Sequence, residues 1–480
     1  MNDRKGFGSN FGFLMAAVGS AVGLGNIWGF PNKMGANGGF PFLILYLALA
    51  LCCGVIIMLG ELALGRKTGH GAVGAYQSIS KRFKWLGWLG IAAAALIFSF
   101  YSALGGYCLR YVVVNFGNLL GAEFGTNGVG GADVFQGLLS QPDVSIAFAL
   151  AFMLITMLVV MSGVGGGIER VCSVGMPALF FILIICIIRS CTLPGAVDGL
   201  KYMFVPGWAV ANGIIDEAPG FWRVLTAAGG QMFFSLSLGA GVMITYGSYL
   251  DKKQDLGKST MIIVGMDTVV ALMAGLCVIP GRFALDPNGA LGGPELLFIT
   301  MQNVFDKMGP AGPVFGILFY LLVFFAAISS SISMLEVIVA HFCDKAREKG
   351  KGDRRKLYSA IVVVICAALC ALVCADGMGS NHISPAELLG LAGAKLPGWS
   401  TSWLGLFDSV AEGLLMPLGA LLMCLMISWE LKPDALRQEI LLNGENRPWV
   451  YDFFRLCVKY ITPLCMLMIL YGQISDFFIV

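Results

Sequence analysis

Two glycine-rich stretches interrupt the apolar parts of this sequence: GSAVGLGN at residues 19–26 and QMFFSLSLGAG at residues 231–241. A helix that crosses lipid must satisfy its own backbone hydrogen bonds, and clustered glycines weaken that ladder. Glycines that only permit tight helix packing are the alternative explanation for either stretch alone. Because the two stretches hold corresponding positions in two halves of the chain, they indicate broken membrane helices whose freed backbone groups bind an ionic substrate and its coupling ion.

The composition is that of an integral membrane protein. Of the 480 residues, 57% are hydrophobic and only 12% are charged, and the mean hydropathy is +0.80. The net charge of +2 is too small to indicate a nucleic-acid partner. The 14 cysteines form no C-x-x-C pair, the three histidines are widely separated, and no nucleophile-elbow, Walker or dinucleotide motif is present. We therefore expect no metal other than alkali ions, and no enzymatic activity.

A bilayer span needs about 20 predominantly apolar residues, and eleven segments of the sequence meet that requirement. The two glycine-rich stretches fall in the first and the sixth of them. We therefore expect an all-α membrane protein with 11 transmembrane helices, of which helices 1 and 6 are broken. The expected spans are approximately 10–35, 40–65, 86–118, 145–163, 171–191, 221–250, 259–283, 310–343, 356–376, 404–430 and 449–478.

The loops predict the orientation of these helices, because cytoplasmic loops retain lysine and arginine. The loop at residues 119–144 has neither, but it contains Glu123, Asp133 and Asp143, as expected of an external loop. Loops rich in lysine and arginine alternate with such loops and share the side of Arg4. We therefore expect a multi-pass protein of a plasma membrane, specifically a bacterial inner membrane, with the N-terminus cytoplasmic and the C-terminus external.

Further motifs accompany the two glycine-rich stretches along nearly the whole chain. They are Phe30-Pro31, Asn37-Gly38-Gly39, GELALGR at 60–66, GIER at 167–170, Thr245-Tyr246, Ser248-Tyr249, Ser329-Ser330-Ser331, Arg455 and YITP at 460–463. In these motifs the chain resembles the neurotransmitter:sodium symporter family, specifically its bacterial amino-acid transporters. The resemblance implies a single transporter domain over residues 1–480, with two inverted five-helix repeats at approximately 10–191 and 221–430 and an appended helix 11 at approximately 449–478.

The resemblance also implies two sodium ions held by oxygen ligands, which suit a hard cation. The ligands of the first ion would be Ala21, Asn26, Ser235 and Asp267, together with the carboxylate of the substrate. The ligands of the second would be Gly19, Val22, Ala326, Ser329 and Ser330. Asp267 lies deep in a span, where a lone charge costs about 3 kcal/mol or more. We expect sodium to be its partner, and we therefore expect no chloride requirement.

A substrate site follows from the same resemblance. Amides around Leu24 and Gly25 and the Tyr101 hydroxyl would bind an α-carboxylate, and Ala21, Phe234 and Ser237 would bind an α-ammonium. The side-chain pocket would be lined by Ser20, Ile97, Ala240, Ser330 and Met334, with Ser235 beside it. Relatives often carry a bulkier residue where this chain has Ala240, which predicts room for a hydrophobic side chain of medium or large size.

Gates are expected on both sides of that pocket. Tyr101 and Phe234 would close above the substrate, and Arg4 and Asp344 match the cytoplasmic gate pair of the family. Glu61, also at membrane depth, is expected to hydrogen-bond the freed backbone of the broken helices.

The external ion-pair gate of the family departs from its usual pattern, because Gly29 stands where an arginine normally precedes Phe-Pro. Lys33 lies four residues on, one helical turn away on the same face. We hypothesise that Lys33 replaces the arginine as the partner of Asp408. A lysine that merely ends a helix in external water is the alternative. Glu336 receives no role from the sequence.

Together these expectations describe sodium-coupled symport of a zwitterionic, hydrophobic amino acid into the cell by alternating access. The main alternative is a sodium-coupled carrier of an amine or osmolyte on the same fold. An amine carrier of this family usually has an acidic residue in the first span, where this chain has Ser20. A channel-like or receptor protein and a membrane enzyme are further alternatives, but the spans contain no constellation of acid, base and nucleophile.

Overall fold

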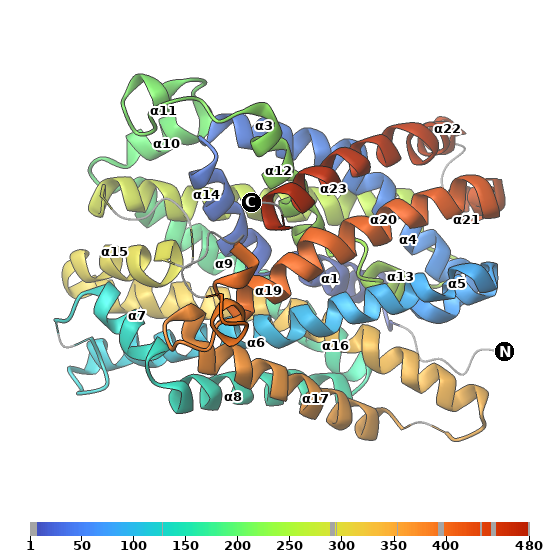
Figure 1. Cartoon of the computed structure of the whole chain (residues 1–480), viewed down its shortest axis with the longest axis horizontal. Coiled ribbons are helices and arrows are strands. Elements are labelled where there is room, and N and C mark those ends of the chain that lie inside the picture. The colour runs from blue at the N-terminus through green and yellow to red at the C-terminus, as the bar shows by residue number, and fades with distance from the viewer. Residues whose placement is uncertain are drawn as a thin grey trace.

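Apolar helices run side by side through most of the chain (Figure 1). The computed structural model describes residues 7–126, 128–288, 293, 295–352, 354–391, 398–432, 434–442 and 448–478. Within those ranges the regular secondary structure is entirely helical. The predicted all-α fold is therefore confirmed.

Nine continuous helical segments within the described ranges are long and apolar enough to cross a membrane. Each overlaps one of the expected spans, which confirms spans 2–5 and 7–11. The segments are Phe40–Thr68 (α3 and α4), Lys81–Leu120 (α6), Pro142–Met161 (α8), Val164–Cys191 (α9), Leu256–Leu285 (α14), Gly309–Glu348 (α16), Arg355–Gly379 (α17), Trp403–Leu431 (α19 and α20) and Pro448–Ser475 (α22 and α23).

The first expected span is broken where its glycines cluster. Helix α1 (Asn10–Ala21) ends at the extended residue Val22, and a π-helical turn (Gly25–Gly29) then leads into α2 (Phe30–Ala36). The two arms are bent by 45°. Counted as one span, this pair is the tenth that could cross a membrane within the described residues, and it confirms the predicted break.

The sixth expected span is divided into α12 (Phe221–Leu236) and α13 (Val242–Gly247). Ser237 has φ 53° and Gly239 has φ 79°, so the chain between the helices is left-handed there. A side chain at Gly239 would also lie 2.2 Å from the Met416 carbonyl oxygen, which excludes any larger residue. The break is as predicted, but neither arm alone reaches membrane length. The expected total of eleven therefore depends on counting two short helices as one span.

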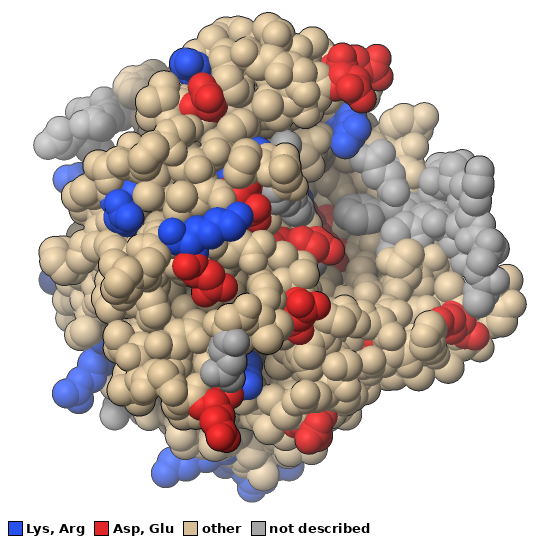
Figure 2. All heavy atoms as spheres, turned by 90° about the vertical axis from the view of Figure 1, so that its left-hand side faces the viewer, with Lys and Arg blue, Asp and Glu red and all other residues tan. Residues whose placement is uncertain are grey.

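Helices α6 and α16 form the most extensive helix pair of the bundle and run beside the two breaks. Helices α8 and α17 lie along one side of the bundle, while α3 and α23 lie on the other (Figure 1). The short helices outside the spans are α5 (Ala72–Ile79), α7 (Gly131–Leu139), α10 (Ala196–Phe204), α11 (Trp208–Ala211), α15 (Met301–Lys307), α18 (Pro385–Leu388) and α21 (Asp434–Leu441). The end of the bundle that carries α7, α10, α11 and α15 is shown in Figure 2, where acidic and basic side chains are scattered around a hollow.

Candidate functional site

The two helix breaks contact each other in the middle of the bundle. The Ser237 hydroxyl donates to the Ser20 carbonyl oxygen at 3.1 Å, and the Gln231 amide donates to the Gly25 carbonyl oxygen at 2.6 Å. All four residues are buried. Side chains of the sixth span thus bind carbonyl groups of the first span, which joins the two breaks.

Three side chains from different spans converge on the Asp267 carboxylate of α14. Asn26 donates to it at 2.7 Å, Ser235 at 3.0 Å and Tyr46 at 3.2 Å. All four residues are fully buried. Asn26, Ser235 and Asp267 were predicted together from the sequence, and Ala21, the last residue of α1, ends the helix next to the same break. The Tyr46 hydroxyl was missed, although a tyrosine inside the apolar second span was a visible signal.

A second group of oxygens lies between α1 and the middle of α16. The Ser330 hydroxyl is 3.4 Å from both the Gly19 and the Val22 carbonyl oxygens. The Ser329 hydroxyl is 3.0 Å from the Ala326 carbonyl oxygen and 3.4 Å from that of Val22. The structure thus brings all five residues predicted for the second sodium site together, as a neutral set of oxygens of the kind that hard cations prefer.

The predicted substrate residues flank the break in the first span. The Leu24 backbone N–H donates to the Tyr101 hydroxyl at 2.8 Å, and the Tyr101 and Phe234 rings lie 6.3 Å apart between centroids. The Ser20 hydroxyl is buried and has no hydrogen-bond partner within the described residues. Buried hydroxyls are normally paired, so this group is open to a ligand. The remaining predicted lining residues, Ile97, Ala240, Ser330 and Met334, are all buried.

Little space separates the first break from the residues opposite it. A Cβ added at Gly23 would lie 2.2 Å from the Ser330 hydroxyl and 2.6 Å from that of Tyr101. At Gly25 it would lie 3.0 Å from the Phe234 ring. The glycines of this stretch therefore permit close approach as well as breaking the helix.

Glu61 of α4 supports the second break. Its carboxylate accepts a hydrogen bond from the Gly239 backbone N–H at 2.7 Å, immediately before α13 begins. Glu61 is almost fully buried. The prediction that this acid binds freed backbone is confirmed.

The predicted external pair of Lys33 with Asp408 needs correction. The Lys33 ammonium forms its ion pair with Glu412, one helical turn beyond Asp408 on the tenth span. Asp408 interacts with both Glu412 and Lys33, so the three groups form one cluster. Spacing on the first span selected the lysine, whereas Asp408 was taken from the gate pattern of the family. Glu412 lies one turn from Asp408, on the same face of the tenth span.

The C-terminal end of α2 is held by the loop helix α10. The Tyr202 hydroxyl donates to the Gly35 carbonyl oxygen at 2.6 Å, and burial raises the pKa of Tyr202 to about 12. A Cβ at Gly39 would lie 2.1 Å from the Tyr202 carbonyl oxygen. The arm that carries Lys33 is thereby fixed to the loop between the fifth and sixth spans.

At the other end of the bundle, the predicted pair of Arg4 with Asp344 cannot be described, because Arg4 lies outside the described residues. Only Asp344 is placed. Asp344 accepts from the Gly71 backbone N–H at 3.2 Å and lies 3.8 Å from Arg347. Nearby, the Phe7 ring packs edge-on against Tyr246 at 5.7 Å between centroids. The described contacts at this end thus join Asp344 to the start of α5 and Phe7 to α13.

Glu336, which had no predicted role, is fully buried in α16 and accepts hydrogen bonds from two side chains. Arg355 of α17 forms an ion pair with it, and the Tyr249 hydroxyl donates to it at 2.6 Å. Because Tyr249 follows α13, this acid joins the broken sixth span to the eighth and ninth spans. Its charge in the sequence signalled a buried partner, but not which one.

Comparison with known proteins gives consistent results. A model of the sodium:neurotransmitter symporter family matches residues 4–129 and 127–478. The uncharacterized sodium-dependent transporter YhdH of Bacillus subtilis is 36% identical over 479 residues, or 97% of each chain. An uncharacterized sodium-dependent transporter of Methanocaldococcus jannaschii is 30% identical, covering 91% of this chain and 84% of the relative. Among solved structures, the crystal structure of MhsT in complex with L-phenylalanine matches with a TM-score of 0.83 and 34% identity, over 98% of this chain and all of that one.

Proposed function

This chain belongs to the sodium:neurotransmitter symporter family, a family of sodium-dependent membrane transporters, and on that premise we propose that it imports a zwitterionic amino acid with a hydrophobic side chain. Two sodium ions accompany each substrate. The observation that carries the proposal is the position of Asp267, a buried carboxylate surrounded by oxygen-bearing side chains beside two helix breaks. A charge in that place indicates a cationic partner.

The first sodium would be held by the Asp267 carboxylate, by Asn26 and Ser235, and by the Ala21 carbonyl. The carboxylate of the substrate completes this set, which makes ion and substrate binding mutually dependent. The second sodium would lie among the Ser329 and Ser330 hydroxyls and the carbonyls of Gly19, Val22 and Ala326. Neither ion requires a charge from chloride, because Asp267 supplies it.

The substrate would lie between the two breaks. Amides at Leu24 and Gly25 and the Tyr101 hydroxyl bind the carboxylate, while carbonyls at the ends of α1 and α12 bind the ammonium. MhsT was crystallised in complex with L-phenylalanine, and the small Ala240 side chain favours a similarly bulky substrate here. An amine or osmolyte remains the alternative substrate class, which Ser20 disfavours because it offers no carboxylate to an amine.

Transport by alternating access follows from the same arrangement. We propose that the inverted repeats at residues 10–191 and 221–430 move against each other, with the Lys33 cluster closing the external side. The N-terminus would lie in the cytoplasm of a bacterial cell. A sodium ion gains about 2.3 kcal/mol from a potential of about 100 mV and about 1.4 kcal/mol from a tenfold gradient. Two ions therefore supply roughly 7 kcal/mol, enough for about a 10⁵-fold gradient of a neutral substrate.

The test is thermal stabilisation of the purified protein by twenty amino acids and by a set of amines and betaines, each in sodium and in potassium, since a ligand of the folded state raises the melting temperature by mass action. We expect stabilisation by hydrophobic amino acids in sodium alone. Asp267→Asn serves as the matched variant, and it should need much more sodium for the same shift. Stabilisation by amines or betaines instead of amino acids would refute the substrate class while leaving sodium coupling intact.

A further inference from the structure

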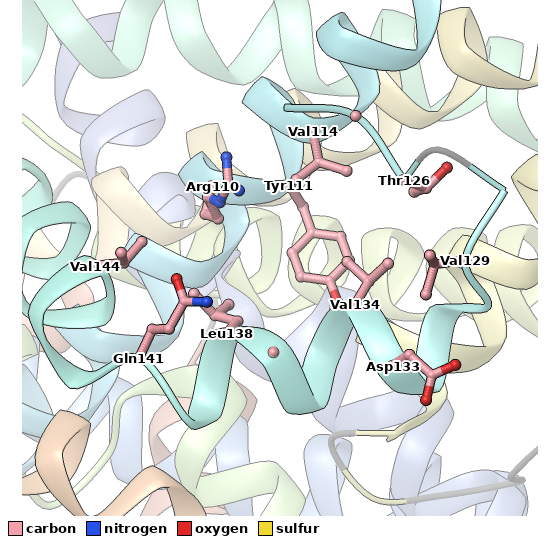
Figure 3. A pocket seen from close by; sticks show the side chains of 12 residues that line it. Arg110, Tyr111, Val114, Thr126, Val129, Asp133, Val134, Leu138, Gln141 and Val144 are labelled. Atoms are coloured by element: carbon pink, nitrogen blue, oxygen red, sulfur yellow. The ribbon is translucent and has the colours of Figure 1, made fainter. Parts of the chain in front are cut away.

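The two ends of the bundle differ in how closely their helices meet. At the end that carries α7, a cavity of about 270 Å³ lies between α6, α7 and the start of α8 (Figure 3). At the other end, where α8 leads into α9, the start of α1 lies directly against the start of α9. One acidic side chain, Glu169, accepts the hydrogen bonds of this contact.

Glu169 binds the chain that leads into α1 with both of its carboxylate oxygens. One oxygen accepts a hydrogen bond from the Gly8 backbone N–H at 2.7 Å, and the other accepts one from the Ser9 hydroxyl at 2.9 Å. Ser9 is also the N-cap of α1, since its hydroxyl accepts from the Gly12 backbone N–H. In the described part of the chain, no other side-chain hydrogen bond joins residues 7–18 to another helix. A negative charge is favourable at this place, because a helix N-terminus is electropositive.

Gly12, in the first turn of α1, leaves the space that the carboxylate occupies. A Cβ added there would lie 1.9 Å from one Glu169 carboxylate oxygen and 2.2 Å from the carboxyl carbon. Glycine inside a helix costs stability relative to alanine. The first turn of α1 therefore gives up some helix stability and gains close contact with the acid.

An irregular turn places Glu169. The residue ends the π-helical turn Val164–Glu169, which follows Gly163 at φ 84° and contains three consecutive glycines. Glycine lowers the cost of changing the backbone conformation, and π-helical turns are less stable than a regular α-helix. The segment that carries the acid is therefore easier to rearrange than the rest of α9.

Cys172 and Met176 continue the face of α9 that Glu169 begins, one and two turns further along. A Cβ added at Gly19 of α1 would lie 3.3 Å from the Cys172 sulfur and 3.4 Å from the Met176 side chain. Both side chains are buried. Gly19 contributes a carbonyl oxygen to the group of oxygens between α1 and α16. The contact of α1 with α9 therefore covers that group of oxygens.

The break in the first span allows α1 to move separately from α2. The helix ends at the extended residue Val22, and the two arms are bent by 45°. A helix that turns about such an end moves most at its other end. For α1 that end is the start of the helix, where Glu169 binds.

We propose that Glu169 is a latch that holds the start of α1 against α9. When its hydrogen bonds break, α1 turns about the first break, and water reaches Cys172 and the oxygens around Gly19. Glu169 is thus a positioning residue for transport and contacts neither sodium nor substrate. This inference rests on the alternating access of the proposed function.

The test measures how fast the Cys172 thiol reacts with N-ethylmaleimide in the full chain, purified in detergent with sodium. Peptide mass spectrometry reports the labelling of each cysteine separately. Cys172 is 1% exposed, so it reacts only when α1 has left α9. Cys108, which is fully buried in α6, is the internal reference for general unfolding.

Glu169→Gln keeps the length of the side chain and removes its charge. It should raise the rate of Cys172 labelling about tenfold or more, because charge-assisted hydrogen bonds of the closed form are lost. The labelling of Cys108 should not change. Glu348→Gln, which removes an exposed acid from the end of α16, is the matched control and should label as the wild type does.

Gly12→Ala tests the same contact without touching the acid. The added methyl group displaces the carboxylate, so Cys172 should again be labelled faster. Alanine strengthens a helix, so this result could not come from a weaker α1. Adding Glu169→Gln to Gly12→Ala should have little further effect, because both act on one contact. Gly166→Ala is the matched control, since a Cβ there has nothing within 4 Å.

Two results would overturn the latch. One is labelling of Cys172 at the wild-type rate in both Glu169→Gln and Gly12→Ala. The other is an equal rise in the labelling of Cys108, which would show general loosening of the fold. Replacing sodium by potassium should speed Cys172 labelling in the wild type. Equal rates in the two salts would refute the proposed second sodium site, while the Glu169 comparison would still decide the latch.

Discussion

Lys33 of the first span pairs with Glu412 of the tenth span, and Asp408, one turn earlier, interacts with both. The Glu412 side chain is only 4% exposed and that of Lys33 is 25% exposed. Removing one member of an ion pair with so little water around it costs more than breaking a surface pair, because the other charge is left buried without a partner. The pair also joins the arm α2, which adjoins the proposed substrate site, to a helix far away in the sequence.

A double-mutant cycle with Lys33→Gln and Glu412→Gln should therefore reveal coupling. We expect a coupling energy of about 1 to 3 kcal/mol in the apparent affinity for substrate, measured by uptake, because the second substitution removes little once the first has broken the pair. The matched cycle of Lys33→Gln with Asp408→Asn should give a smaller value. A larger coupling to Asp408 would favour the pair of Lys33 with Asp408 instead.

Replacing chloride by gluconate should leave sodium-dependent uptake at its full rate. The reason is that the Asp267 carboxylate supplies a negative charge beside the proposed first sodium site. Asp267→Asn removes that charge and should raise the sodium concentration for half-maximal uptake roughly tenfold or more, since a contact with a charged group is worth about 1.5–3 kcal/mol. Loss of wild-type uptake in gluconate would show that a bound anion is required after all.

Gly23→Ala should abolish uptake. The added methyl group would lie 2.2 Å from the Ser330 hydroxyl and 2.6 Å from that of Tyr101, so the break and α16 could not approach as they do. Gly175→Ala is the matched control, because a Cβ there has nothing within 4 Å. Uptake by the Gly23→Ala protein at the control rate would show that the close approach is not needed for transport.

Glu336→Gln should lower the stability of the folded protein by about 3–5 kcal/mol, because it leaves the Arg355 guanidinium without its buried counter-charge. The measurement is thermal or denaturant unfolding in detergent. Replacing both Glu336 and Arg355 by methionine should recover much of the loss. Asp198→Asn, in the exposed pair with Lys201, is the comparison and should cost less than about 1 kcal/mol. Equal effects of Glu336→Gln and Asp198→Asn would contradict the structural role of the buried pair.

Much of this structure could be predicted from local features of the sequence. The spans followed from runs of apolar residues, and both breaks followed from clustered glycines. The residues around Asp267 and those around Ser329 were grouped by resemblance, and the structure brings each group together. Glu61 was assigned to freed backbone because a buried acid needs donors, and the Gly239 amide is such a donor.

Contacts between side chains on distant helices could not be predicted in the same way. Tyr46 was not recognised as a partner of Asp267, because an apolar span with one hydroxyl does not indicate the direction in which the hydroxyl points. Glu336 received no role from the sequence, since spacing along the chain does not show how its helix and that of Arg355 face each other. That the buried Tyr111 hydroxyl has no hydrogen-bond partner within the described residues can be seen only once its neighbours are known.

The sequence by itself determined that this protein is a helical membrane protein with interrupted first and sixth spans, because hydropathy and glycine content act locally on the backbone. Its motifs also determined the family, since different motifs of that family are distributed along nearly the whole chain. Only the tertiary structure decided that Lys33 binds Glu412, because Asp408 and Glu412 share one helix face and spacing treats them alike. The choice between the two acids depends on the depth and the rotation of α2 relative to the tenth span. Both are determined by the packing of the whole bundle.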